Sequence, residues 1–141
     1  MSNDRALTVA CPQCEKQQTI IVWDAVNVLE EPDMKEEVLE QRVNMFVCTG
    51  CGKPITVDMP FLYHDPEQRF VVQYVTAEEA GSPEYYEYLY KDGTVVMEEE
   101  AMEAAERSGG QYLLLPHQVF SMRELAAYVV FRDMCEEYGR E

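Results

Sequence analysis

The sequence predicts an α+β fold that combines short strands, a helix between them and a long last helix in 141 residues. Three observations support this prediction. Two Cys-x-x-Cys motifs each lie between short runs rich in β-branched residues, a pattern typical of β-hairpins. Apolar residues at helical spacing lie between the motifs, and a second such set lies near the C-terminus. The composition, with 47% hydrophobic and 27% charged residues, is that of a globular protein.

The first half of the chain places a strand, Cys-x-x-Cys, strand unit on either side of a helix. This helix is predicted over 33–42. Pro32 suits its first turn, and Met34 and Val38 have the spacing of one helical face. Residues 63–66 have turn chemistry and precede a further strand. The strands are expected over 6–10, 19–23, 44–47, 54–58 and 69–75.

A composition break divides the chain. Residues 76–83 contain Gly, Ser and Pro and are expected to form a linker. They separate a domain at 8–76 from an acidic α/β segment at 77–141. Within that segment the Asp-Gly pair at 92–93 predicts a hairpin turn. An acidic start followed by two glycines predicts a helix over 98–107.

The final helix is predicted over 122–138. Ser121 and Glu124 match a capping box, in which each side chain satisfies a free backbone N–H group, and Gly139 is placed to stop the helix. Apolar residues cover nearly all sides of the first two turns. Either the tyrosine-rich acidic segment encloses this helix, or one of its faces contacts a second chain.

The paired cysteines carry the sharpest functional signal. Cys11 and Cys14 form one pair. Cys48 and Cys51 form the other, after 33 intervening residues. Two turns that each supply two thiolates complete a closed tetrahedral site for one structural Zn²⁺ ion. Gly52 suits a turn that needs a positive φ. We therefore predict a zinc-ribbon-like antiparallel β domain with an inserted helix, followed by an α/β segment that ends in the long helix.

Two other chemistries use the same residues. A single Cys-x-x-Cys motif is also the form of a redox dithiol protein, whose motif lies at a helix N-terminus that lowers the pKa of a thiol. Here a strand is expected after Cys14, and the second motif would have no role. Four thiolates also bind iron, so the sequence leaves the choice between zinc and iron open.

Several short motifs occur in a fixed order along residues 8–76. They are Cys-Pro-x-Cys at 11–14, Glu-Pro-Asp at 31–33, Asn-x-Phe-x-Cys-x-x-Cys-Gly at 44–52 and Leu-Tyr-His-Asp at 62–65. In this order they resemble the CpXC family of bacterial and archaeal proteins. Thr49 and Gly50 depart from the family, which tends to repeat Pro in the second pair. The resemblance implies metal binding by the two cysteine pairs and leaves the biochemical role open.

The two histidines and the fifth cysteine are expected to have structural rather than catalytic roles. His64 and Asp65 are adjacent, but neighbours in an extended chain point to opposite faces, so we expect a turn cap and a tethered imidazole rather than an acid–base pair. His117 is expected to be structural. Cys135 lies on a helical stripe with Phe131 and is expected to be a buried apolar side chain. No catalytic residue is predicted.

The charge of the chain argues against polyanionic partners. It has 11 basic and 27 acidic residues, a net charge of -16, and residues 77–141 carry -10 of this. Such a surface repels nucleic acid and anionic membranes. The longest apolar run, residues 125–131, is far shorter than a membrane-spanning helix. The start of the chain lacks the pattern of a secretory signal. We therefore expect a cytoplasmic protein.

These features predict a non-enzymatic zinc-binding protein-interaction module. Its partner is expected to be a protein that contacts the final helix and the acidic half with Tyr85, Tyr86, Tyr88 and Tyr90, and a homodimer is the second choice. The alternative is an enzyme, either a Cys-x-x-Cys redox dithiol protein or a hydrolase that uses His64. Four sulfurs that converge without an open ligand position favour the module. A pocket that joins His64 to a carboxylate favours the enzyme.

Overall fold

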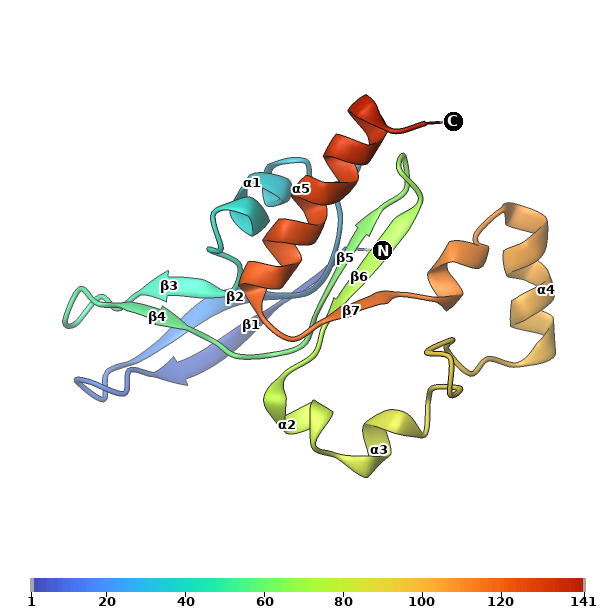
Figure 1. Cartoon of the computed structure of the whole chain (residues 1–141). Helices are drawn as coiled ribbons and strands as arrows, with labels where there is room; N and C mark the ends of the chain where they lie inside the picture. The colour runs from blue at the N-terminus through green and yellow to red at the C-terminus, as the bar shows by residue number, and fades with distance from the viewer. Residues whose placement is uncertain (1, 141) are drawn as a thin grey trace.

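The computed structural model of the protein describes residues 2–140 (Figure 1). Within this range the main sheet has the order β1-β2-β5-β6-β7, and β3 and β4 pair separately. The strands are β1 (Asn3–Ala10), β2 (Gln17–Asn27), β3 (Met45–Val47), β4 (Pro54–Thr56), β5 (Phe61–Asp65), β6 (Phe70–Tyr74) and β7 (His117–Val119). The helices are α1 (Asp33–Leu39), α2 (Ala77–Ala80), α3 (Pro83–Tyr86), α4 (Glu99–Ser108), the 3-10 helix η1 (Gln111–Leu114) and α5 (Met122–Tyr138). The predicted α+β class is confirmed.

The two cysteine-bearing hairpins are antiparallel, whereas the main sheet is mixed. β1 pairs antiparallel with β2, and β3 pairs antiparallel with β4. β5 and β6 are also antiparallel, but β2 pairs parallel with β5 and β6 parallel with β7. A parallel pair needs a crossover connection. α1 and the β3–β4 hairpin form the crossover from β2 to β5, and residues 75–116 form the crossover from β6 to β7.

The hydrophobic core lies between one face of the main sheet and the helices α1 and α5, which pack against each other (Figure 1). Its fully buried side chains include Phe61 and Tyr63 of β5, Val38 of α1, and Leu125 and Val129 of α5. Burial of such side chains is the main favourable contribution to folding. Residues from both sides of the predicted linker therefore share one core, and the division into segments 8–76 and 77–141 stays a prediction.

Helix α5 has the predicted bounds, and its N-cap differs in one bond. The Ser121 Oγ atom accepts a hydrogen bond from the Glu124 backbone N–H at 3.0 Å, as a capping box requires. The Glu124 carboxylate, however, accepts from the backbone N–H of Phe120, one residue earlier than expected. The cap therefore satisfies a free N–H group on the entering chain.

The prediction that Cys135 is buried is wrong. α5 buries the face that contains Leu125, Ala126 and Val129. The stripe that contains Phe131 and Cys135 lies on the opposite side of the helix from Val129 and is exposed. The tyrosine-rich segment does not enclose it. Apolar periodicity identified two faces of this helix, and contact with β6, β7 and α1 decides which one is buried.

Three local predictions shift. α1 ends before the predicted boundary at 42, because Gln41 adopts a positive φ of 57°. Tyr63 and His64 lie in β5 rather than in a turn, which starts at Pro66. The segment predicted as a linker contains the short helix α2 and the first residue of α3, and α2 begins with a capping box between Thr76 and Glu79.

The acidic segment follows the remaining predictions. The turn at 92–93 has Gly93 at φ 89°, and the hairpin around it is reduced to one bridge between Leu89 and Val95. α4 lies within one residue of its predicted bounds and ends at Gly109 in the left-handed conformation. None of the helices within residues 2–140 has the length and hydropathy that crossing a bilayer requires.

Candidate metal centre

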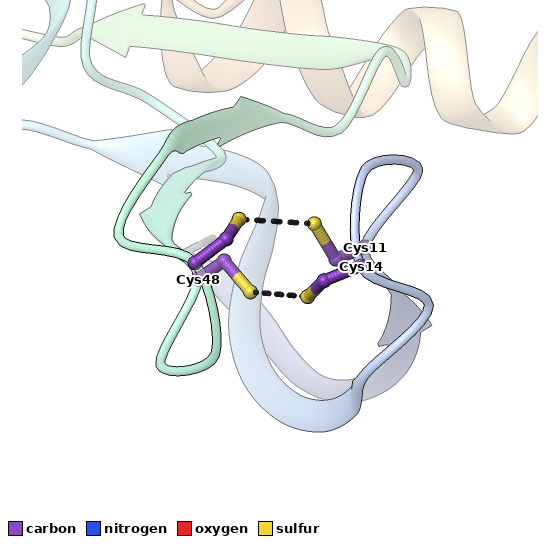
Figure 2. Close-up of side chains that lie close together, drawn as sticks. Cys11, Cys14 and Cys48 are labelled. Carbon is purple, nitrogen blue, oxygen red and sulfur yellow. Dashed lines mark hydrogen bonds between the residues drawn. The ribbon is translucent and has the colours of Figure 1, made fainter.

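The four paired cysteines lie at the tips of two β-hairpins that meet (Figure 2). One tip joins β1 to β2 and carries Cys11 and Cys14; the other joins β3 to β4 and carries Cys48 and Cys51. The four Sγ atoms lie within 4.8 Å of one another. The sulfur of Cys11 is 3.7 Å from that of Cys51, and the sulfur of Cys14 is 3.5 Å from that of Cys48. The edge of a sulfur tetrahedron around zinc is about 3.8 Å, so both distances suit a shared metal ion.

The two turns have the same hydrogen bonds. In each turn the first thiol accepts a backbone N–H two residues further on, from Gln13 to Cys11 at 3.4 Å and from Gly50 to Cys48 at 3.3 Å. The backbone of the first cysteine also closes each turn, with equivalent bonds of 2.8 and 2.9 Å in the two hairpins. N–H groups directed at sulfur stabilise a thiolate, the form in which cysteine binds metal.

The residue directly after each pair has a left-handed backbone. Gly52 has a φ of 74°, which confirms the expectation for this position, and Glu15 has a φ of 63° at the equivalent place in the first turn. A residue with a Cβ atom pays about 1–2 kcal/mol for this conformation. The first turn therefore holds its geometry at a conformational cost that the second turn avoids.

The thiols have unequal proton affinities. Backbone N–H groups of Cys51 and Gly50 stabilise the Cys48 thiolate and lower its pKa to about 6. The backbone N–H of Lys16 lowers the pKa of Cys14, but the nearby Cys48 sulfur and burial outweigh it and raise the pKa to about 11. Four sulfurs at this spacing cannot all ionise without a cation between them. A divalent ion supplies the charge that makes four thiolates compatible.

Asn44 fixes the second hairpin against the main sheet. Its Oδ1 atom accepts the Trp23 backbone N–H at 2.7 Å, and its Nδ2 group donates to the Trp23 carbonyl at 3.0 Å. Its own carbonyl accepts from Val57 at 2.8 Å, so it also joins the start and end of the β3–β4 hairpin. Asn44 is buried at a φ of 58°, a conformation that Asn adopts more readily than most residues. Our sequence analysis missed this role, although an Asn directly before a strand could have indicated it.

The other candidate side chains lie away from the sulfur cluster. Within residues 2–140, the group of potential metal ligands contains the four cysteines alone. The His64 Nε2 atom lies 2.6 Å from the Tyr112 hydroxyl, and burial lowers the pKa of His64 although Asp65 opposes this. Asp65 caps the following turn by accepting the backbone N–H of Gln68, as expected. His117 stacks on a tyrosine ring at the start of β7.

Comparison with known proteins yields one match. The profile of the CpXC family, described as CpXC protein, matches residues 9–135. No curated protein and no solved structure matches the chain. The matched range includes both cysteine pairs and most of α5, so it extends well beyond the motifs at 8–76.

Proposed function

Because this chain belongs to the CpXC family and places four cysteine sulfurs within 4.8 Å of one another, we propose that it binds one structural Zn²⁺ ion. The proposed ligands are Cys11, Cys14, Cys48 and Cys51. The convergence of four sulfurs from two hairpins is the observation that carries this proposal. Zinc suits the set because it favours tetrahedral thiolate coordination and has no redox chemistry of its own.

The proposed metal is a cross-link rather than a reactive centre. Four protein thiolates fill a tetrahedral site and leave no position for water or substrate, which catalytic zinc needs. Each hairpin supplies half of the ligands, so the ion would join the β1–β2 tip to the β3–β4 tip. A redox role has less support, because a strand rather than a helix follows each Cys-x-x-Cys turn. For a hydrolase, the His64 Nε2 atom contacts a tyrosine hydroxyl and not a carboxylate.

The zinc proposal is tested by the metal content of purified full-length protein. Wild-type protein should contain one zinc per chain, and Cys48→Ser should lose it. Cys135→Ser is the matched control, because this thiol is exposed on α5 and lies outside the cluster. Wild-type protein without stoichiometric zinc, or a Cys48→Ser variant that keeps it, would contradict the proposal. A stoichiometric content of iron in place of zinc would change the identity of the proposed metal and leave the four proposed ligands unchanged.

We also propose that the exposed face of α5 contacts a partner protein, which makes the chain an interaction module. Phe131 and Tyr138 on this face are 58% and 75% exposed, and Met134 lies between them. Glu136 and Glu137 flank the face, in a chain of net charge -16. An aromatic centre with a charged rim is typical of protein interfaces. The partner that complements this face has an apolar centre and a basic rim.

Substitution on this face tests the interaction. Phe131→Asp should remove the proteins that the wild-type chain captures from its host, with zinc content unchanged. Ala104→Asp, exposed on α4 rather than on α5, is the control and should capture them as before. Identical capture by wild type and Phe131→Asp would contradict the proposal. A wild-type dimer in sedimentation that Phe131→Asp dissociates would identify a second copy as the occupant and overturn the assignment of a basic partner.

A further inference from the structure

Two arginines without a carboxylate partner lie at one edge of the main sheet. Arg69 belongs to the turn between β5 and β6, and Arg132 belongs to α5. Within residues 2–140, the ion pairs of arginine involve other positions, and neither of these two takes part. Acidic residues outnumber basic ones by 27 to 11 in this chain. Even so, Arg5 and Arg42 are the arginines that form ion pairs within residues 2–140. What sets Arg69 and Arg132 apart from the remaining arginines is that they line the same hollow.

Each guanidinium group is held in place by an aromatic ring and a backbone carbonyl. Arg132 lies 4.8 Å from the ring centre of Phe70 and donates to the Gln68 carbonyl at 3.2 Å. Arg69 lies 5.3 Å from the ring centre of Tyr112 and donates to the carbonyl at the C-cap of α4. A guanidinium has five N–H donors, so each arginine keeps donors that no protein acceptor uses. Side chains fixed in this way lose little entropy when they bind an anion.

The two arginines line a hollow of about 200 Å³ together with His117, Tyr112 and Tyr128. β7 begins at His117, which pairs with Val72, so the edge of β6 before that residue has no strand beside it. This missing pairing leaves the space between α5 and η1. No aspartate or glutamate lines the hollow. It is thus a positively charged site on a strongly negative protein.

A larger hollow of about 780 Å³ adjoins the first and shares Leu115, His117 and Tyr128 with it. The ring of His117 stacks on Tyr128 at 3.9 Å between ring centres, with an interplanar angle of 6°. The rest of the lining includes Tyr86 and Tyr90 from the segment that follows α2. This second hollow offers aromatic surface directly beside the charged one.

We propose that the smaller hollow binds the carboxylate or phosphate group of a small organic anion, whose ring or other apolar part lies in the larger hollow. Guanidinium groups match the planar oxygens of carboxylates and the oxygens of phosphates, and they form strong charge-assisted hydrogen bonds with both. The tyrosines of the larger hollow supply apolar contact for the body of the ligand. This site lies outside the cysteine cluster and uses different residues from the exposed face of α5.

Titration of the zinc-loaded full chain with benzoate, phenyl phosphate and inorganic phosphate tests this site. The NMR signals of the His117 and Tyr128 rings should shift and saturate with at least one of the aryl anions. Whichever of benzoate and phenyl phosphate binds more tightly identifies the anionic group that the site prefers. Arg69→Gln and Arg132→Gln should each weaken that binding about tenfold or more, since each removes charge-assisted hydrogen bonds. Arg123→Gln, exposed on α5 and outside the lining, should leave it unchanged.

Three results would overturn the proposal. The first is the absence of saturable shifts with both aryl anions. The second is equal weakening by Arg123→Gln, because binding would then reflect net charge alone. The third is a folded Arg69→Gln that binds as wild type; this residue is exposed, so the variant decides the matter even if Arg132→Gln fails to fold. If inorganic phosphate binds as tightly as phenyl phosphate, the larger hollow does not contribute to binding and is not part of the site.

Discussion

The cysteine-bearing hairpins and the sheet beside them are stabilised in different ways. No residue of β3 or β4 is buried, whereas four of the five residues of β5 are buried. At the hairpin tips the buried apolar residues are Cys11 and Cys48 themselves, with 2% and 1% of their surfaces exposed. The sheet has an apolar core against α1 and α5, and the tips have none. A region that buries so little apolar surface depends on a cross-link.

The comparison assigns one kind of stabilisation to each region. Apolar burial stabilises the sheet and its helices, whatever the state of the cysteines. The proposed zinc ion, with the Asn44 hydrogen bonds at the base of the β3–β4 hairpin, stabilises the tips. Changes in one region should therefore leave the other intact, and the predictions below test this separation.

The largest effect is expected in the core. Leu125→Ala removes a fully buried side chain that packs between α5 and the sheet, and should lower the free energy of unfolding by about 2–5 kcal/mol. Urea denaturation measures this change. Val130→Ala, exposed on the same helix, is the control and should change it by less than about 0.5 kcal/mol. Folded Leu125→Ala should still bind one zinc. Loss of zinc at a lower urea concentration than in wild type, together with the core transition, would show that the two regions are not separate.

Asn44 connects the two regions, so its replacement should affect the tips more than the core. Asn44→Ala leaves the partly buried N–H and carbonyl of Trp23 without these partners and should lower the free energy of unfolding by about 1–3 kcal/mol. Asn44→Gly loses the same bonds but tolerates the φ of 58°, so it should be less harmful than alanine. Zinc affinity and urea denaturation measure both effects. An alanine variant with wild-type zinc affinity would show that Asn44 does not position the second hairpin.

Acid should weaken zinc binding. Cys14, with a pKa raised to about 11, releases a proton when metal binds at neutral pH. Cys48, with a pKa lowered to about 6, is ionised above that pH and adds a further displaced proton only below it. Affinity should therefore fall about tenfold per pH unit for each proton displaced, and fall more steeply below about pH 6. Competition with a chelator of known affinity measures this. An affinity that does not change between about pH 8 and pH 5 would contradict thiolate ligation.

The smallest effects are expected at the two left-handed positions, and they should have opposite signs. Gly52→Ala places a residue with a Cβ atom at a φ of 74° and should weaken zinc binding by about 1 kcal/mol. Glu15→Gly relieves the same strain in the first turn and should strengthen binding by up to about 1 kcal/mol. Isothermal titration of both variants measures the difference. Two changes of the same sign would show that the turns are not equivalent.

Local signals allowed the sequence to predict most elements and the cysteine cluster. The Cys-x-x-Cys spacing, Gly52 and the cap at Ser121 each depend on neighbouring residues, and the structure places them as expected except for the Glu124 bond of the cap. The mixed sheet was not predictable in this way, because the partner of a strand can lie far along the chain. β2 pairs with β5 across the whole second hairpin, and β7 joins β6 from more than 40 residues away.

Burial of α5 and the charged hollow depend on the same long-range contacts. Cys135 and Val129 both lie on apolar stripes, and contact with the sheet alone distinguishes the buried stripe from the exposed one. The hollow forms from Arg69, Arg132 and His117, which belong to three separate elements. No spacing in the sequence connects these residues, so sequence analysis did not find them.

Hydrogen exchange in zinc-loaded and chelator-treated protein tests the separation of the two regions most directly. On removal of zinc, amides at residues 11–18 and 44–56 should lose protection, because these tips have no apolar core. Amides of β5, β6 and α5 should keep theirs, because the sheet retains its own core. Equal loss of protection in all of these elements, or unchanged protection at the tips, would contradict the account.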